Sequence, residues 1–168
     1  AEQRLGEERF DVAAQVQPVE LPLPPPPASI DRFHLERYQA LRPLGLVRFA
    51  RAEVAAMERE AGEPAAREFV YYAYASTDDY PAARRVGREL DIPAGVRERV
   101  LYPLAFWPEV SQAAGDNQVD PLLVVSLIRQ ESLFDPQARS GADARGLMQL
   151  LPATARREAG FMGWTDDP

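Results

Sequence analysis

Cysteine and lysine are absent from this sequence of 168 residues, and histidine occurs once. Without cysteine the chain has no disulfide, no thiolate metal site and no thiol nucleophile. The single histidine, His34, cannot build a zinc site alone, and any Ser-His-Asp triad would have to use it. We interpret His34, which lies among arginines and a glutamate at the start of a predicted helix, as a surface or capping residue.

Long apolar runs and an excess of positive charge are missing as well. No run reaches the roughly 18–20 apolar residues that a membrane-spanning helix needs. The chain opens without a charged-then-apolar leader, so we expect either that a leader has been removed or that the sequence is an internal segment. The formal net charge of −7 disfavours nucleic acid as the main partner, because phosphate binding requires a basic surface. No glycine-rich phosphate loop precedes a helix, and we predict neither an organic cofactor nor a metal.

Proline dominates the end of the first segment, residues 1–28. Six of the twelve residues from 17 to 28 are proline, which fixes the backbone φ angle and removes amide donors. We therefore expect 1–28 to be an extended linker. A spacer is the favoured interpretation, and a ligand for a proline-recognition module is the alternative.

Residues 29–104 have the apolar spacing of short helices joined by brief polar turns. This pattern is typical of a helical superhelix or solenoid. The tyrosines at 71, 72 and 74 fit core packing between helices better than stacking on sugars. The predicted helices cover 30–41 (with Ser29 as N-cap), 46–61, a stretch from Pro64, 81–90 and the region of 96–101.

The most informative helix is predicted after Asp120, the expected N-cap, with Pro121 at the first helical position. The helix is predicted over 122–134, and its first two turns are apolar on almost every side, so we expect it to be largely buried. Helical spacing places Glu131 on an apolar stripe. Burial favours the protonated form of a carboxyl group, as a general acid requires. The alternative is an ion pair with Arg129 or Arg139.

A turn-rich stretch at 140–146 follows, and a second helical segment is expected over 147–157. Gln149 offers a donor and an acceptor suited to sugar hydroxyls or an acetamido group. Met148 offers an adaptable apolar surface for a sugar face. In the alternative interpretation Met148 belongs to the core and Gln149 is merely exposed.

Two separated blocks carry a resemblance to a known family. The first is IRQESLFDP at 128–136, followed by Ser140, and the second is GLMQLLPATA at 146–155. In this register they resemble the soluble lytic murein transglycosylases, glycoside hydrolase family twenty-three. The resemblance implies an all-α chain, with a helical superhelix ahead of a lysozyme-like catalytic domain over 105–168.

The resemblance also implies a reaction and a set of site residues. Glu131 would protonate the glycosidic oxygen between N-acetylmuramic acid and N-acetylglucosamine, then act as base to give a 1,6-anhydro product. Ser140 would lie beside the reacting sugar, and Met148 and Gln149 would line the cleft. The implied partner is the glycan strand of peptidoglycan, in the periplasm or cell envelope. A hydrolase of lysozyme or chitinase type and a non-catalytic glycan-binding scaffold are the alternatives.

The sequence departs from the family pattern in two places. Asp143 stands where the family usually has glycine, and aspartate is among the residues that tolerate positive φ. The family's catalytic domain also continues beyond the last residues of this sequence. We therefore expect 105–168 to be an incomplete domain with exposed apolar area and little or no activity by itself.

Overall fold

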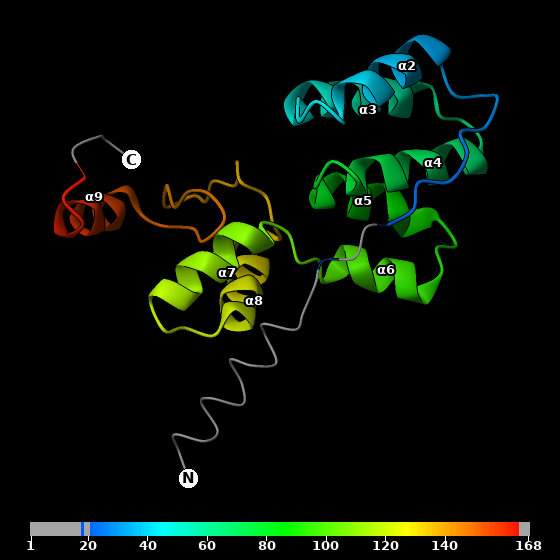
Figure 1. Ribbon diagram of the computed structural model, residues 1–168. Helices are drawn as coiled ribbons and strands as arrows, with labels where there is room; N and C mark the ends of the chain where they lie inside the picture. Colours follow the sequence, from blue (N-terminus) through cyan, green and yellow to red (C-terminus); the bar gives the residue numbers. More distant parts are fainter. Residues whose placement is uncertain (1–17, 19–20, 165–168) are drawn as a thin grey trace. The chain divides into compact units, whose positions relative to one another are not determined.

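The computed structural model describes residue 18 and residues 21–164, and the regular secondary structure of this part is helical (Figure 1). The chain divides into two compact units, with the division between Pro103 and Leu104. The sequence analysis placed this boundary one residue later. Within the described part, no helix is both long enough and apolar enough to cross a bilayer.

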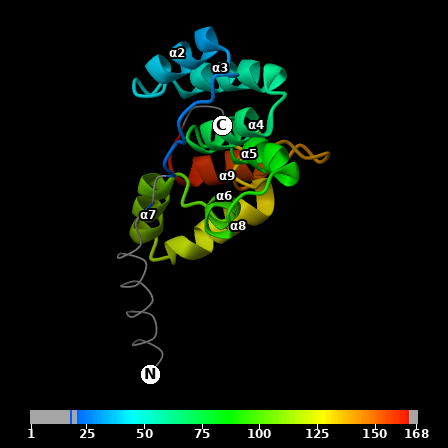
Figure 2. The same cartoon turned by 90° about the vertical axis from the view of Figure 1, so that its right-hand side faces the viewer.

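The first unit is a stack of short helices. Each helix packs against the next along the chain, so that the pair α2–α3, the pair α4–α5 and α6 form successive layers (Figures 1 and 2). The bounds are α2 Arg32–Leu41, α3 Val47–Glu60, α4 Pro64–Ala75, α5 Tyr80–Val86, the 3-10 turn η1 Gly87–Glu89, and α6 Ala94–Leu101. The predicted helix 81–90 thus changes at residue 87 from α-helix into a 3-10 turn.

The start of α2 differs from the prediction. The N-cap is Asp31, two residues beyond Ser29, because the Asp31 carboxylate accepts a hydrogen bond from the backbone N–H of His34 at 2.8 Å. The His34 ring is engaged as well, with Nδ1 2.7 Å from Oε2 of the buried Glu53. Arg37 donates to the other oxygen of Glu53 at 2.7 Å. His34 therefore joins α2 to α3.

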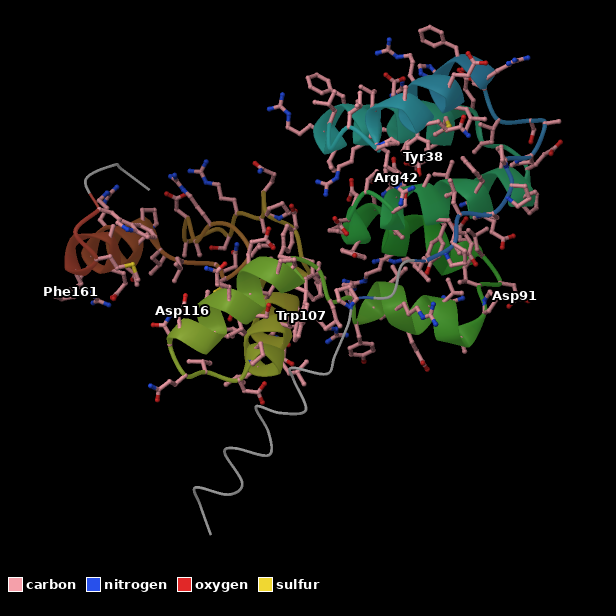
Figure 3. The ribbon with its side chains drawn as sticks, in the orientation of Figure 1. Tyr38, Arg42, Asp91, Trp107, Asp116 and Phe161 are labelled. Carbon is pink, nitrogen blue, oxygen red and sulfur yellow. The ribbon has the colours of Figure 1, made fainter. Side chains whose placement is uncertain are left out.

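The core of this unit is built around α4. Tyr71, Tyr72 and Tyr74 are all buried, as the interpretation of the tyrosine cluster as core required. Tyr38 of α2 and Arg42, the residue that follows this helix, are directed toward α4 (Figure 3). The Tyr38 hydroxyl lies 2.6 Å from the Ser76 hydroxyl oxygen, and Arg42 donates to the Ser76 carbonyl at 3.2 Å.

The proline-rich segment is extended from residue 21 to residue 27, without helix or strand. It is not a separate connector, because Leu21 and Leu23 are half-buried against the core of the helical stack. The leucines between the prolines are the signal for this packing. The rest of the predicted linker, except Pro18 and Ala28, lies outside the described residues.

The second unit contains α7 Trp107–Asp116, α8 Pro121–Ser132 and α9 Pro152–Phe161. Helix α7 packs against α8, and Trp107 and Val110 on α7 are buried. The second helical segment was expected to begin at 147, but α9 begins at Pro152. The five residues before it belong to a hydrogen-bonded loop between α8 and α9, which carries the predicted site residues.

Candidate functional site

Helix α8 begins as the sequence predicts. The Asp120 carboxylate accepts a hydrogen bond from the N–H of Leu122 at 2.9 Å, and Pro121 occupies the first helical turn, where its missing N–H costs nothing. Because this cap fixes the helix start, it also fixes which residues share each face downstream.

The expectation of a largely buried α8 is wrong. Only one stripe of the helix is buried, formed by Pro121, Val125 and Ile128. A second apolar stripe is open, with Leu123 62% and Leu127 41% exposed. Some apolar side chains of α8 are therefore not covered by any of the described residues.

Glu131 continues the open stripe, not the buried one. It lies four residues after Leu127 and eight after Leu123, which places the three side chains along one face of the helix. The side chain of Glu131 is exposed, so the predicted burial is also wrong. No residue among 21–164 forms a hydrogen bond or ion pair with its carboxylate, and Arg139, one of the two suggested partners, pairs with Asp143. Glu131 is thus an accessible acid at the end of an apolar surface.

The chain reverses directly after this acid. Helix α8 ends at Ser132, and Leu133 and Phe134 both have left-handed backbone conformations, with φ of 54° and 66°. Two consecutive non-glycine residues in this region are unusual and costly, because Cβ crowds the carbonyl oxygen. Phe134 is 2% exposed, and this anchor holds the turn. The helix that was predicted to reach residue 134 therefore ends two residues earlier, at Ser132.

The loop between α8 and α9 is held by a small ladder of backbone hydrogen bonds. Arg145 and Leu150 exchange two of them, at 2.9 and 3.1 Å, and the N–H of Gly146 donates to the Ala138 carbonyl at 3.0 Å. Gly146 has φ of 73°, a conformation that glycine adopts without strain.

Gln149 fastens this loop from within. Its side-chain N–H group donates to the carbonyls of Ala138 at 3.1 Å and Gly146 at 3.0 Å. The donor that the sequence analysis assigned to a sugar is therefore used inside the loop. Gln149 is half-buried, and its backbone has a left-handed conformation with φ of 48°.

Ser140 and Met148 lie on the same loop and are exposed. The Ser140 hydroxyl oxygen accepts hydrogen bonds from the N–H groups of Ala142 and Ala144, at 3.2 and 3.1 Å. Its own hydrogen remains available for an outside acceptor. Met148 is 38% exposed, so it is surface and not core.

Asp143 has φ of 65°, the conformation for which glycine is the usual choice, and it carries two ion pairs. Its carboxylate accepts hydrogen bonds from Arg139 at 2.6 Å and from Arg145 at 2.9 Å. The hydrogen bonds from Arg145 and then Arg139, with their positive charges, hold the pKa of the Asp143 carboxyl below its ordinary value. A residue that looked like a departure from the family pattern therefore acts as a clamp across the loop.

Sequence reasoning missed two parts of this arrangement. The i, i+4 spacing of Arg139 and Asp143 could have indicated the clamp. The paired left-handed residues Leu133 and Phe134 gave no signal, since neither is a glycine or asparagine. Among the described residues, no group of three or more histidine, aspartate or glutamate side chains could hold a metal ion.

Comparisons with known proteins match this same region. The family model of the transglycosylase SLT domain covers residues 109–167. The transglycosylase of Enterobacteria phage PRD1 is 42% identical over 53 residues, which are 32% of this chain and 20% of that protein. Membrane-bound lytic murein transglycosylase C of Histophilus somni is 42% identical over 67 residues, which are 40% of this chain and 18% of that protein. The chain spans at most a fifth of the length of these two relatives.

A solved structure extends the likeness to the helical stack. It is the lytic transglycosylase Slt of Pseudomonas aeruginosa, in an inactive glutamate-to-glutamine mutant. The similarity has a TM-score of 0.54 at 24% identity and covers 99% of this chain and 28% of that one. This similarity and the helical elements confirm the predicted all-α fold class. Residues 109–167 are thus similar to the transglycosylase SLT domain, and the likeness at the level of the fold extends over the rest of the chain.

Proposed function

We propose that the protein is a peptidoglycan lytic transglycosylase with Glu131 as its catalytic acid and base. The observation that carries the proposal is the position of this residue. A carboxylate that is accessible and has no partner among residues 21–164 ends the open apolar stripe of α8, and the loop between α8 and α9 begins two residues later. The relatives named as transglycosylases support this assignment, and so does the glutamate whose replacement accompanies inactivity in the Pseudomonas protein.

The proposed reaction consumes no water. The Glu131 carboxyl donates its proton to the glycosidic oxygen while the bond from that oxygen to C1 of N-acetylmuramic acid breaks. The 6-hydroxyl oxygen of the same sugar then bonds to C1, and its proton passes to Glu131. The products are a free 4-hydroxyl on N-acetylglucosamine and a 1,6-anhydro sugar, and the carboxyl group regains the proton it gave.

The open stripe has a role in this chemistry. A glycan laid over Leu123 and Leu127 would exclude water from the end of α8, where the charged carboxylate depends on that water for solvation. Loss of solvation favours the protonated form that the first step needs. The apolar stripe would therefore prepare the acid only when substrate is present.

The loop residues fit supporting roles. The unused hydrogen of the Ser140 hydroxyl can be donated to an oxygen of the reacting sugar, and Met148 can contact a sugar face. Gln149 serves by holding the carbonyls of Ala138 and Gly146, which keeps the loop in one shape. We therefore assign the side-chain N–H group of Gln149 a positioning role. Its side-chain carbonyl oxygen is the atom that could contact the substrate.

The implied partner is the glycan strand of peptidoglycan, and the implied location is the cell envelope, in the periplasm. The name of the Histophilus relative, a lytic murein transglycosylase, supports both. We further propose that residues 29–104 form the solenoid-like helical segment and that 105–168 are the N-terminal part of the catalytic domain. The division of contacts at residue 103 supports this arrangement.

The test uses the protein at the full length that its gene encodes, incubated with purified peptidoglycan. We expect mass spectrometry to detect anhydromuropeptides, and we expect Glu131→Gln to lower their rate of formation by roughly 10²- to 10⁴-fold. Glu109→Gln is the matched control, since Glu109 is exposed on α7 of the same unit. Equal loss in both variants, or no product from the folded protein, would overturn the proposal.

A further inference from the structure

A second candidate site lies in the helical stack, far along the sequence from Glu131. A pocket of about 180 Å³ opens between α4, α5, η1 and α6. Its apolar walls are the Tyr71 ring, Val100 and Leu101, and Gly87 forms part of its surface. Three arginines complete the lining, Arg84, Arg88 and Arg97. The pocket is therefore mainly apolar, and the charged side chains that line it are all positive.

One of these arginines is held in place by the fold. Arg97 donates to the carbonyl of Leu90 at 2.9 Å and to that of Gly87 at 3.4 Å, which ties α6 to η1. A guanidinium group has further N–H donors, and these stay available at the pocket. Arg88 is exposed on η1 at the same pocket. The pocket therefore holds a positive charge that is positioned before any ligand arrives.

Tyr71 gives a second and independent sign of a ligand. The residue is 2% exposed, and its hydroxyl oxygen is buried without a hydrogen-bond partner in the part of the chain that the structure describes. Burying such a group without a hydrogen-bond partner is unfavourable, so an unpaired buried hydroxyl calls for an explanation. Burial raises the pKa of Tyr71 to about 12, against the opposing charge of Arg97, so the phenol keeps its hydrogen at neutral pH.

We propose that this pocket binds a small carboxylate with a short apolar body. The carboxylate would accept hydrogen bonds from Arg97 and Arg88, and from the Tyr71 hydroxyl, for which residues 21–164 supply no acceptor. The apolar body would pack on Val100 and Leu101. The pocket is smaller than the roughly 300 Å³ at which drug-sized sites begin, so only a few carbon atoms of the ligand can enter it.

Two sources can supply this chemistry, a free short-chain acid or the carboxyl end of a peptide. The probes are therefore butyrate for the first source and acetyl-alanyl-alanine for the second. Inorganic phosphate tests charge without an apolar body, and acetyl-alanyl-alanine amide tests the body without the charge. The methyl groups of Val100 and Leu101, observed by NMR in the full chain, report occupancy at the pocket itself.

We expect saturable shifts of these methyl signals with butyrate or with the peptide acid. The probe that binds with the higher affinity identifies the source. Arg88→Gln should weaken binding about tenfold, which corresponds to the loss of one charge-assisted hydrogen bond. Arg99→Gln is the matched control, because Arg99 is exposed on α6 and does not line the pocket. Arg97→Gln should weaken binding further, but it also removes the tie to η1.

Tyr71→Phe separates binding from folding. The hydroxyl has no partner within the described part of the chain, so its removal should leave the free energy of unfolding unchanged or raise it, while binding weakens roughly threefold or more. Unchanged affinity in both Tyr71→Phe and Arg88→Gln would overturn the proposal. Equal shifts with phosphate or with the peptide amide would also overturn it, as would equal weakening by Arg99→Gln.

Discussion

Replacing Gly87 by alanine places a methyl group 2.6 Å from Cε2 and 2.8 Å from Cδ2 of the Tyr71 ring. Carbon atoms pack at about 3.5–4.0 Å, so either the ring or η1 must move by close to 1 Å. Tyr71 is buried in the core, and Arg97 ties η1 to α6. Neither side can move without loss of packing.

Overpacking of this kind costs about 1–3 kcal/mol. The backbone φ of Gly87 is −70°, which alanine accepts, so the change also gains about 0.4–1 kcal/mol through the unfolded chain. We therefore expect a net loss of about 1–2 kcal/mol in the free energy of unfolding of this unit, a factor of roughly 5–30 in its equilibrium constant.

Amide hydrogen exchange is the suitable assay, because it reports each unit separately. The N–H groups of Val70 and Ala73 lie on fully buried positions of α4 and should lose protection by that factor. Gly95→Ala is the matched control, since nothing lies within 4 Å of the added methyl group and Gly95 is on α6 of the same unit. Unchanged protection in Gly87→Ala, or an equal loss in Gly95→Ala, would refute the reasoning from steric contact.

Three further predictions concern charges and the loop. The hydrogen bonds from Arg85 lower the pKa of Glu58 below its ordinary value of 4.5, although burial opposes them. Glu58→Gln should therefore cost about 1 kcal/mol near neutral pH, and the difference in denaturation midpoint should shrink as pH falls below 4.5, because only the wild-type loses its charge. A difference that grows on acidification would contradict this sign. Asp143→Ala should melt at a lower temperature than Asp143→Gly, because both lose the ion pairs and only alanine is strained at positive φ; equal midpoints would argue against strain. Gln149→Glu replaces a donor by an acceptor that faces two carbonyls, so amide exchange over 138–150 should quicken by about tenfold or more, and unchanged exchange would remove its role as a fastener.

The helices could be predicted from local signals in the sequence. Caps and first-turn prolines act on the backbone within a few residues of themselves. The starts of α8, at Asp120 and Pro121, and of α4, at Pro64, therefore follow from the sequence. Ser29 shows the limit of this reasoning. Asp31 competes for the same role two residues later, and only the hydrogen bond to His34 decides between them.

Burial could not be predicted in the same way. Residues 122–128 are almost all apolar, and an apolar sequence does not reveal which of its stripes finds a partner. The choice of Val125 over Leu127 depends on where α7 packs, which is a long-range property. The conclusion that Glu131 is buried failed for that reason.

The site loop was only partly predictable. The spacing of Ser140, Met148 and Gln149 placed them on one segment after Glu131, and the structure keeps them there. The use of Gln149 as an internal fastener depends on carbonyls eleven and three residues away, brought together by the turn at Gly146. Left-handed conformations at Leu133 and Phe134 have no marker in residue type.

We propose that Glu131 cleaves the glycan without water: it donates its proton to the glycosidic oxygen and receives the proton of the sugar's own 6-hydroxyl group in return. Digestion of peptidoglycan in water enriched in oxygen-18 tests this directly by mass spectrometry of the released muropeptides. We expect 1,6-anhydro products without the heavy isotope, formed by the wild-type protein and lost in Glu131→Gln. Reducing products that carry one oxygen-18 at C1 would contradict it and would assign the site to a hydrolase.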